Sequence, residues 1–216
     1  MTAARMQGRD HAPRSAPTKL GVLVSGTGSN LQAILDAIAD GSLNAEVKLV
    51  ISNRPGVVAL DRAARAGVPA LVIPHKNFTT REDFDRALVA ALRENGVEWI
   101  VLAGFMRVLT PEFLRAFSGR IINIHPALLP AFPGVEAIKQ AFEYGVKITG
   151  CTVHYVELGV DLGKIIAQRA VPIEPSDDLA SLSARMHEAE HALFVNVLRE
   201  IAAGNVMPLA NARNEV

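Results

Sequence analysis

Two polar side chains close an otherwise apolar run at residues 121–126, which read IINIHP. Alternate residues of a β-strand point to the same side, so Asn123 and His125 can act on one substrate group. Pro126 stops the strand, which predicts that the pair lies at the carboxyl edge of a sheet, where open α/β sheets bind ligands. An Asn amide can donate to a developing oxyanion, and a His can carry the proton that acyl transfer to an amine must move. The pair is therefore suited to acyl transfer.

A carboxylate beside His125 would favour the charged form of its ring near neutral pH. Asp161 is the candidate, because it lies in the segment ELGVDLG (157–163), whose two glycines indicate an irregular turn between strands. Each residue taken alone has a plainer explanation, since Asn and His at strand ends commonly form turns or satisfy hydrogen bonds in the core. The spacing by itself leaves both interpretations open.

A glycine-rich segment, SGTGSN (25–30), separates the first apolar run from a helical pattern. The N-terminus of a helix behind such a loop offers free N–H groups and a positive dipole to an anion. The segment lacks the third glycine of a dinucleotide-binding loop, because Leu31 stands in its place, and it lacks the lysine of a P-loop. It therefore favours a small phosphate ester. A tight turn in which Ser29 or Asn30 caps the helix fits equally well.

The remaining candidate side chains have weaker patterns. His75 follows a proline in a loop and His154 lies within a strand-like run, so we expect structural roles for both. His187 and His191 are four residues apart on a helical pattern, but no third ligand is evident and no metal site is predicted. Cys151 has no marked base partner, so a covalent nucleophile is not expected.

Apolar runs alternate with helical patterns in a way that is typical of parallel βαβ units. The predicted fold is α/β, a mostly parallel, twisted, Rossmann-like sheet with helices on both faces, an antiparallel C-terminal strand pair and a long C-terminal helix. The expected parallel strands are 20–24, 47–51, 71–73, 99–103 and 121–124, all apolar as in strands covered on both faces. The expected antiparallel pair is 148–157 and 164–173. The expected helices cover 31–39, 59–66, 79–93 (with a capping box of Thr79 and Glu82), 111–117, 135–144 and 178–203.

The overall composition excludes several classes of protein. Lys plus Arg and Asp plus Glu both number 22, so the chain has no net field to attract nucleic acid or an anionic membrane. It has no apolar run of the roughly 18–20 residues that span a bilayer. Its single cysteine suits a reducing compartment, so we expect a cytoplasmic protein acting on small molecules. We expect a disordered tail at 1–18, one domain at 19–204 and a mobile tail at 205–216, and homodimerisation is common enough to expect.

Five segments occur together along the chain, namely VLVSGTGSNLQAI, VLAGFMRVLTPEF, INIHPALLPAFPG, TGCTVHYVELGVDLGKII and HEAEHA. Between residues 19 and 203 the sequence resembles the phosphoribosylglycinamide formyltransferases, the folate-dependent transformylases of purine synthesis. INIHPALLP with HYVELGVDLG is specific for folate-dependent formyl transfer, and SGTGSN narrows the resemblance to the glycinamide ribonucleotide branch.

The resemblance implies transfer of a formyl group from the cosubstrate 10-formyltetrahydrofolate to the amine of glycinamide ribonucleotide. It implies that Asn123, His125 and Asp161 are catalytic. It also implies a phosphate-binding N-terminal half and a folate-binding C-terminal half. The implied ribonucleotide contacts are Gly28, Ser29, Asn30 and Glu190. The implied folate contacts, besides Asn123 and Asp161, are Arg81 for the glutamate tail, Met106, Arg107, Val108 and Leu109 for the pterin wall, and Glu157, Leu158, Gly159 and Val160 for the surrounding loop.

The chain departs from the family pattern at Ala131, where many relatives have a lysine, and at Glu136, where they often have histidines nearby. Other members of the superfamily remain alternatives. A tRNA formyltransferase usually has a C-terminal nucleic-acid-binding domain, and a formyltetrahydrofolate hydrolase an N-terminal regulatory one, for which we expect no room here. The alternative from another class is a non-catalytic nucleotide-binding module or a dehydrogenase-like domain. The incomplete glycine pattern argues against binding of a dinucleotide.

Overall fold

The computed structural model describes residues 16–210, so residues 1–15 and 211–216 of the two predicted tails lie outside the described part. Seven strands form one sheet in the order β3-β2-β1-β4-β5-β6-β7. The strands are β1 (Thr18–Val24), β2 (Ala45–Ser52), β3 (Ala70–Val72), β4 (Trp99–Leu102), β5 (Ile121–His125), β6 (Ile148–Tyr155) and β7 (Ile165–Pro172). The helices are α1 (Ser29–Ala39), α2 (Val58–Arg65), α3 (Arg81–Glu94), α4 (Pro111–Ala116), α5 (Ala137–Tyr144) and α6 (Leu179–Ala202), with a short 3-10 turn η1 (His75–Asn77).

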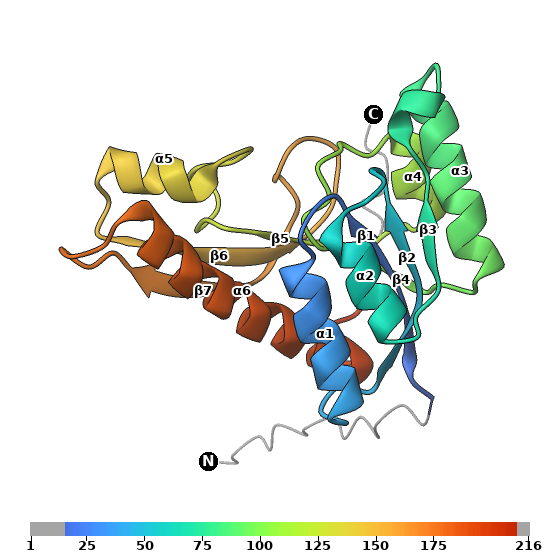
Figure 1. Ribbon diagram of the computed structural model, residues 1–216, viewed down its shortest axis with the longest axis horizontal. Helices are drawn as coiled ribbons and strands as arrows, with labels where there is room; N and C mark the ends of the chain where they lie inside the picture. Colours follow the sequence, from blue (N-terminus) through green and yellow to red (C-terminus); the bar gives the residue numbers. More distant parts are fainter. Residues whose placement is uncertain (1–15, 211–216) are drawn as a thin grey trace, which may run out of the picture.

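The sheet has the predicted mixed topology. All neighbouring strands from β3 to β5 are parallel, whereas β6 is antiparallel to both β5 and β7. Figure 1 shows α1, α2 and α6 on one face of the sheet and α3 and α4 on the other. The first face packs around Leu31 and Phe194, and the second around Phe84 and Phe113, all of which are buried. The predicted fold class is therefore confirmed.

Strand β3 differs from the prediction in its burial. It pairs only with β2, and Leu71 and Val72 are 42% and 40% exposed. We expected all five parallel strands to be covered on both faces, and this expectation is wrong for β3. The reason is its position, because a three-residue strand at the edge of a sheet lies at the margin of both helical layers.

The cap of α3 is also displaced by one residue from the prediction. Thr80, not Thr79, is the N-cap, and its Oγ1 accepts a hydrogen bond from Asp83 N at 3.1 Å. The Thr80 hydroxyl in turn donates to the Asp83 carboxylate at 2.7 Å. The sequence TTRED satisfies the capping pattern in two overlapping frames, so the local pattern alone could not separate them.

The segment after α6, for which we expected a mobile tail, is attached to the sheet as far as the structure describes it. The Tyr155 hydroxyl donates to Met207 O at 2.6 Å, and Leu209 N donates to Gly119 O at 2.9 Å. A Cβ on Gly119 would lie 2.1 Å from Leu209 O, so only glycine allows this close approach.

The strand register brings several loops to one place. Leu23 of β1 lies beside Leu102 of β4, Leu102 lies beside Asn123 of β5, and Asn123 lies beside His154 of β6. The loops that leave β1 and β4 therefore begin next to the end of β5. This edge of the sheet is where the predicted polar residues gather.

Candidate active site

Asn123 and His125 lie two residues apart at the end of β5, as predicted. His125 is the last residue of the strand and is 4% exposed. His154 lies directly across from Asn123 on the antiparallel strand β6. The distance between His154 Nε2 and Asn123 Nδ2 is 3.2 Å. The two strands thus place an amide and two imidazoles close together.

Asp161 reaches these side chains from the loop between β6 and β7. Its Oδ2 lies 3.3 Å from His125 Nδ1, and its Oδ1 lies 3.6 Å from His154 Nε2. Asn123 Nδ2 donates to Oδ1 at 3.5 Å, and Gly134 N donates to Oδ2 at 2.8 Å. We call Asn123, His125, His154 and Asp161 the Asp161 cluster, because the one carboxylate faces the other three side chains.

Both ring nitrogens of His125 face acceptors. Nε2 lies 2.8 Å from the carbonyl oxygen of Phe132, and Nδ1 faces the Asp161 carboxylate. The two nitrogens of His125 thus lie beside a backbone carbonyl on one side and a carboxylate on the other.

His154 plays a part that the sequence did not reveal. Its Nδ1 lies 2.8 Å from the Tyr155 carbonyl oxygen, which requires a proton on Nδ1. Its Nε2 lies beside both Asn123 Nδ2 and the Asp161 carboxylate, so His154 helps to fix the positions of both side chains. We expected a structural histidine within a strand, and the structure instead places it in the Asp161 cluster. The proximity of His154 to Asn123 follows from the pairing of β6 with β5, which the sequence alone does not specify.

The Asp161 carboxyl is held in its charged form. Burial opposes the charge, but the contact with His154, the Gly134 amide and the nearby His125 ring outweigh it, so its pKa lies below the usual value. A carboxylate with these partners is ionised at neutral pH. It can therefore balance a positive charge on His125 during a reaction.

The backbone around the Asp161 cluster adopts unusual conformations. In residues 16–210, the non-glycine residues with positive φ are Phe132, Glu136 and Asp161, with φ of 50°, 56° and 55°. Phe132 supplies the carbonyl that faces His125, and Asp161 supplies the carboxylate. Strained residues of this kind persist where the surrounding structure holds them, and they concentrate at functional sites.

The glycine-rich loop has the form of an anion site. Gly28 is the N-cap of α1 with φ 70°, and no side chain caps the helix. A Cβ on Gly28 would lie 2.6 Å from Ala59 Cβ, so glycine is required by both conformation and packing. Asn30 is buried, and its Oδ1 has no hydrogen-bond partner. The alternative in which Ser29 or Asn30 caps the helix is therefore wrong, because the helix already begins at Ser29.

The loop after β4, residues 103–110, is fastened to other elements, and it buries Phe105 and Leu109 in the core while exposing Met106 and Val108. Arg81 Nη2 donates to Val108 O at 2.7 Å, and the buried Asp85 accepts from Thr110 N at 2.6 Å. Met106 and Val108 are 62% and 50% exposed. Leu158 is also exposed, on the loop that carries Asp161. Both loops therefore expose apolar side chains to solvent.

Comparison with known proteins decides the family. The pattern of the formyl transferase family matches residues 18–198. The chain belongs to the formyl transferase family. The resemblance inferred from the sequence motifs is thereby confirmed.

Similar proteins of this family are named as phosphoribosylglycinamide formyltransferases or as purine biosynthetic proteins. Phosphoribosylglycinamide formyltransferase of Bacillus subtilis is 40% identical over 87% of this chain and 96% of that protein. The structure of glycinamide ribonucleotide transformylase 1 from Symbiobacterium toebii superposes with a TM-score of 0.86 at 46% identity, covering 88% of this chain and 90% of that one. The trifunctional purine biosynthetic protein adenosine-3 of Drosophila pseudoobscura pseudoobscura is 50% identical over 98% of this chain, which spans only 16% of that larger protein.

Glu190 of this formyl transferase is a buried acid on α6. It is 5% exposed, and burial raises its pKa to about 7. His187 Nε2 lies 3.9 Å from its Oε2. No described contact joins Glu190 to the Asp161 cluster, but α6 packs against α1, the helix that carries Asn30. A carboxyl with a strongly raised pKa is typical of functional sites.

The raised pKa of Glu190 predicts a pH-dependent cost to stability. Between about pH 4.5 and pH 7 the unfolded chain releases this proton and the folded chain keeps it, so the free energy of unfolding falls as the pH rises. Glu190→Gln should therefore be more stable than the wild type at pH 8, by up to about 3 kcal/mol, and similar to it near pH 4.5. Urea unfolding at both pH values measures this, with the exposed Glu188→Gln as the matched control. Equal gains at both pH values would contradict the assignment.

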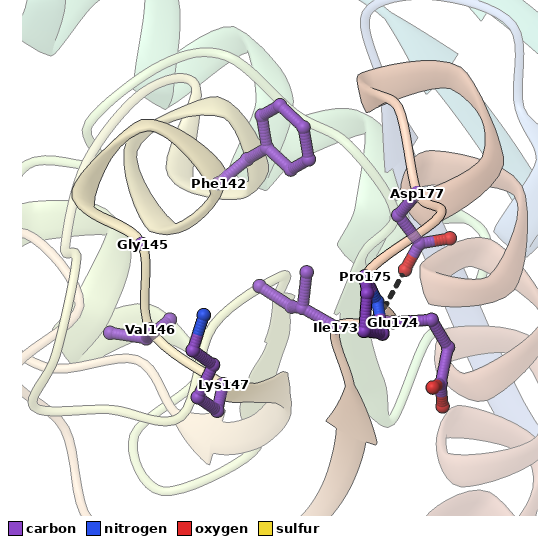
Figure 2. Close-up of a pocket in the computed structure, with 8 residues that line it drawn as sticks. All are labelled: Phe142, Gly145, Val146, Lys147, Ile173, Glu174, Pro175 and Asp177. Carbon is purple, nitrogen blue, oxygen red and sulfur yellow. Dashed lines mark hydrogen bonds between the residues drawn. The ribbon is translucent and has the colours of Figure 1, made fainter.

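A separate hollow of about 310 Å³ lies between the end of α5 and the turn from β7 into α6. Figure 2 shows Phe142 and Ile173 pointing toward it, with Asp177 accepting a hydrogen bond from the backbone of Glu174. The Asp177 carboxylate also binds Arg185 and Ser181, which fix the start of α6. None of the residues of the Asp161 cluster lines this hollow, so the hollow is separate from the candidate active site.

Within residues 16–210, no three His, Cys, Asp or Glu side chains are grouped so as to hold a metal ion. No helix in that range is long and apolar enough to cross a membrane. Cys151 is buried, and burial together with the Glu190 charge raises its pKa to about 12, so it is a poor nucleophile.

Proposed function

We propose that this formyl transferase moves a formyl group from 10-formyltetrahydrofolate to the amine of glycinamide ribonucleotide. The observation that carries the proposal is the convergence of Asn123, His125 and Asp161 in a chain of this family. The names of the Bacillus and Symbiobacterium relatives support the choice of ribonucleotide. The proposal covers one reaction only, because this chain spans 16% of the trifunctional relative and is not expected to share all of its activities.

The reaction begins when the amine nitrogen attacks the formyl carbon, forming a C–N bond as the carbonyl electron pair moves onto oxygen. Asn123 and protonated His125 hold the resulting oxyanion, and Asp161 balances the charge of His125. Collapse of the intermediate breaks the bond to N10 of the folate. The proton that leaves the amine reaches N10 through a water oriented by Asp161.

This mechanism requires an exchange of hydrogen bonds. In the structure, His125 Nε2 donates to Phe132 O, and Asn123 Nδ2 is directed toward His154 and Asp161. The oxyanion takes the place of the Phe132 carbonyl as the acceptor for His125. The positive φ of Phe132 supports such a displacement, because a strained loop loses less on moving than a relaxed one.

The substrate-binding roles follow from the glycine-rich loop and the exposed loops. The N–H groups behind Gly28, with Ser29 and Asn30, bind the phosphate, and Glu190 contacts the ribose side of the ribonucleotide. The segment from Met106 to Leu109 forms the wall of the pterin pocket. The loop from Glu157 to Val160 closes around it. Arg81, whose guanidinium already holds Val108 O, meets the glutamate tail of the folate.

The proposed reaction is tested by incubating the protein with 10-formyltetrahydrofolate and following the absorbance of the deformylated folate with and without glycinamide ribonucleotide. We expect deformylation only when the ribonucleotide is present. Deformylation without it would identify a hydrolase instead. A complete lack of deformylation would favour a nucleotide-binding module.

His154 is expected to act through Asn123. His154→Phe keeps the bulk of the buried ring but removes the ring nitrogen that lies beside Asn123 Nδ2. The amide then loses its fixed orientation, so kcat should fall about ten-fold, as expected for one hydrogen bond of about 1.4 kcal/mol. The KM for the ribonucleotide should stay unchanged. Steady-state kinetics measure both, and an unchanged kcat in a variant of normal thermal stability would remove His154 from the site.

A further inference from the structure

A buried chain of hydrogen bonds lies behind the pterin wall. Ser25 follows β1, Asn53 follows β2, and they are 4% and 1% exposed. The Ser25 hydroxyl donates to Asn53 Oδ1 at 2.6 Å and accepts from Met106 N at 2.9 Å. We propose that Ser25 is a positioning residue, which fixes the donor pocket by holding the backbone of Met106. This inference rests on the proposed function, because it takes the Met106 segment as the wall of the folate pocket.

The hydroxyl of Ser25 has one arrangement that satisfies its partners. The Met106 N–H can only donate, so the Ser25 oxygen is its acceptor, and the one Ser25 proton is left for Asn53 Oδ1. The serine therefore acts as a fixed acceptor for the Met106 N–H.

The position of Met106 depends on this hydrogen bond more than the position of a buried residue would. Its side chain is 62% exposed, so burial does little to place it. The other described hydrogen bonds of this loop lie before Met106, where Ala103 N donates to Leu23 O at 2.9 Å, and after it, at Val108 and Thr110. Without the Ser25 oxygen, the Met106 end of the wall has no described polar attachment, whereas its far end stays fastened to α3.

Ser25 also borders the glycine-rich loop. The next residue is Gly26, whose carbonyl oxygen accepts from Ala59 N at 3.2 Å, which ties the loop to α2. One serine therefore stands between the proposed phosphate loop and the proposed folate wall. Its hydroxyl points to the wall, so its loss should affect the folate and not the ribonucleotide.

A matched control is available one strand away. Ser52 ends β2 and is 0% exposed, and its hydroxyl donates to Arg54 O at 2.6 Å and accepts from Arg54 N at 3.1 Å. Like Ser25, it is a buried serine at the end of a strand with one donated and one accepted hydrogen bond. It has no described contact with residues 103–110. A purely structural role predicts similar consequences for both serines.

The test compares Ser25→Ala with Ser52→Ala in the full-length protein. We expect Ser25→Ala to raise the KM for 10-formyltetrahydrofolate about ten-fold, while kcat and the KM for the ribonucleotide change by less than about two-fold. Ser52→Ala should lower thermal stability to a similar degree and leave both KM values unchanged. Equal folate KM values in the two variants, or a parallel change of both substrates' KM in Ser25→Ala, would overturn the proposal.

Asn53→Ala provides a second route if Ser25→Ala does not fold. It leaves the serine in place but frees its hydroxyl, so the folate KM should rise about three-fold, and an unchanged folate KM would overturn the proposal. Where Ser25→Ala does fold, the double variant should be no worse than Ser25→Ala alone. Additive effects would show that the residues do not act as one chain. A wild-type protein that transfers no formyl group would refute the proposed function and, with it, this inference. An active wild-type protein whose Ser25→Ala variant keeps the folate KM of the wild type would refute this inference alone.

Discussion

Asp161→Asn is expected to lower kcat about a thousand-fold while ribonucleotide binding stays intact. Asparagine keeps the size of the side chain and retains an oxygen to accept from Gly134 N. It removes the negative charge that lies 3.3 Å from His125 Nδ1, so the charged ring loses its counter-ion. The water that carries the proton to the folate nitrogen loses its acceptor as well. Steady-state kinetics at saturating substrates and calorimetric titration with the ribonucleotide measure the two effects.

The matched control for this substitution is Asp177→Asn. Asp177 is another well-bound carboxylate, whose pKa is lowered to about 2, chiefly by its hydrogen bond with Arg185. It lies at the start of α6, outside the Asp161 cluster. Asp177→Asn should therefore lower thermal stability and leave kcat near the wild-type value. An Asp161→Asn enzyme that works within ten-fold of the wild type would exclude Asp161 from the mechanism.

The fold was predictable because its parallel strands are short apolar runs separated by amphipathic helices. Strands covered on both faces leave little doubt about their type, as β4 shows with all of its residues buried. The errors occurred where local patterns fit two answers. The segment TTRED offered overlapping caps for α3, and the apolar run at β3 did not indicate that this strand forms the edge of the sheet.

The site was predictable only in part, for a related reason. Asn123 and His125 share a strand, so their spacing sufficed to place them on one side. Their neighbour His154 comes from the register of β6 against β5, which no local pattern specifies. Asp161 lies on an irregular loop, and its approach to His125 depends on the unusual backbone at Asp161 itself and on the Gly134 amide. The hydrogen bonds between Ser25, Asn53 and Met106 join three separate segments and left no mark on the sequence pattern.

His125→Ala is expected to reduce kcat by about three orders of magnitude, because it removes both the proton carrier and a donor to the oxyanion. The ring is 4% exposed, so its removal leaves a cavity in which free imidazole can bind. Added imidazole should therefore restore part of the activity of the variant without activating the wild type. Recovery of turnover with rising imidazole concentration is the measurement.

The pair of His125 and Asp161 should behave as one unit in a double-mutant cycle. Asp161 acts chiefly by balancing the charge on His125, so once the ring is gone only its hold on the relay water is left to contribute to the chemistry. The combined variant His125→Ala, Asp161→Asn should be only a few-fold slower than His125→Ala, far from the millionfold loss that independent contributions would give. Full additivity would mean that Asp161 works apart from the imidazole, through its water or through Asn123 alone. The proposed counter-ion role would then be wrong even though each single variant is inactive.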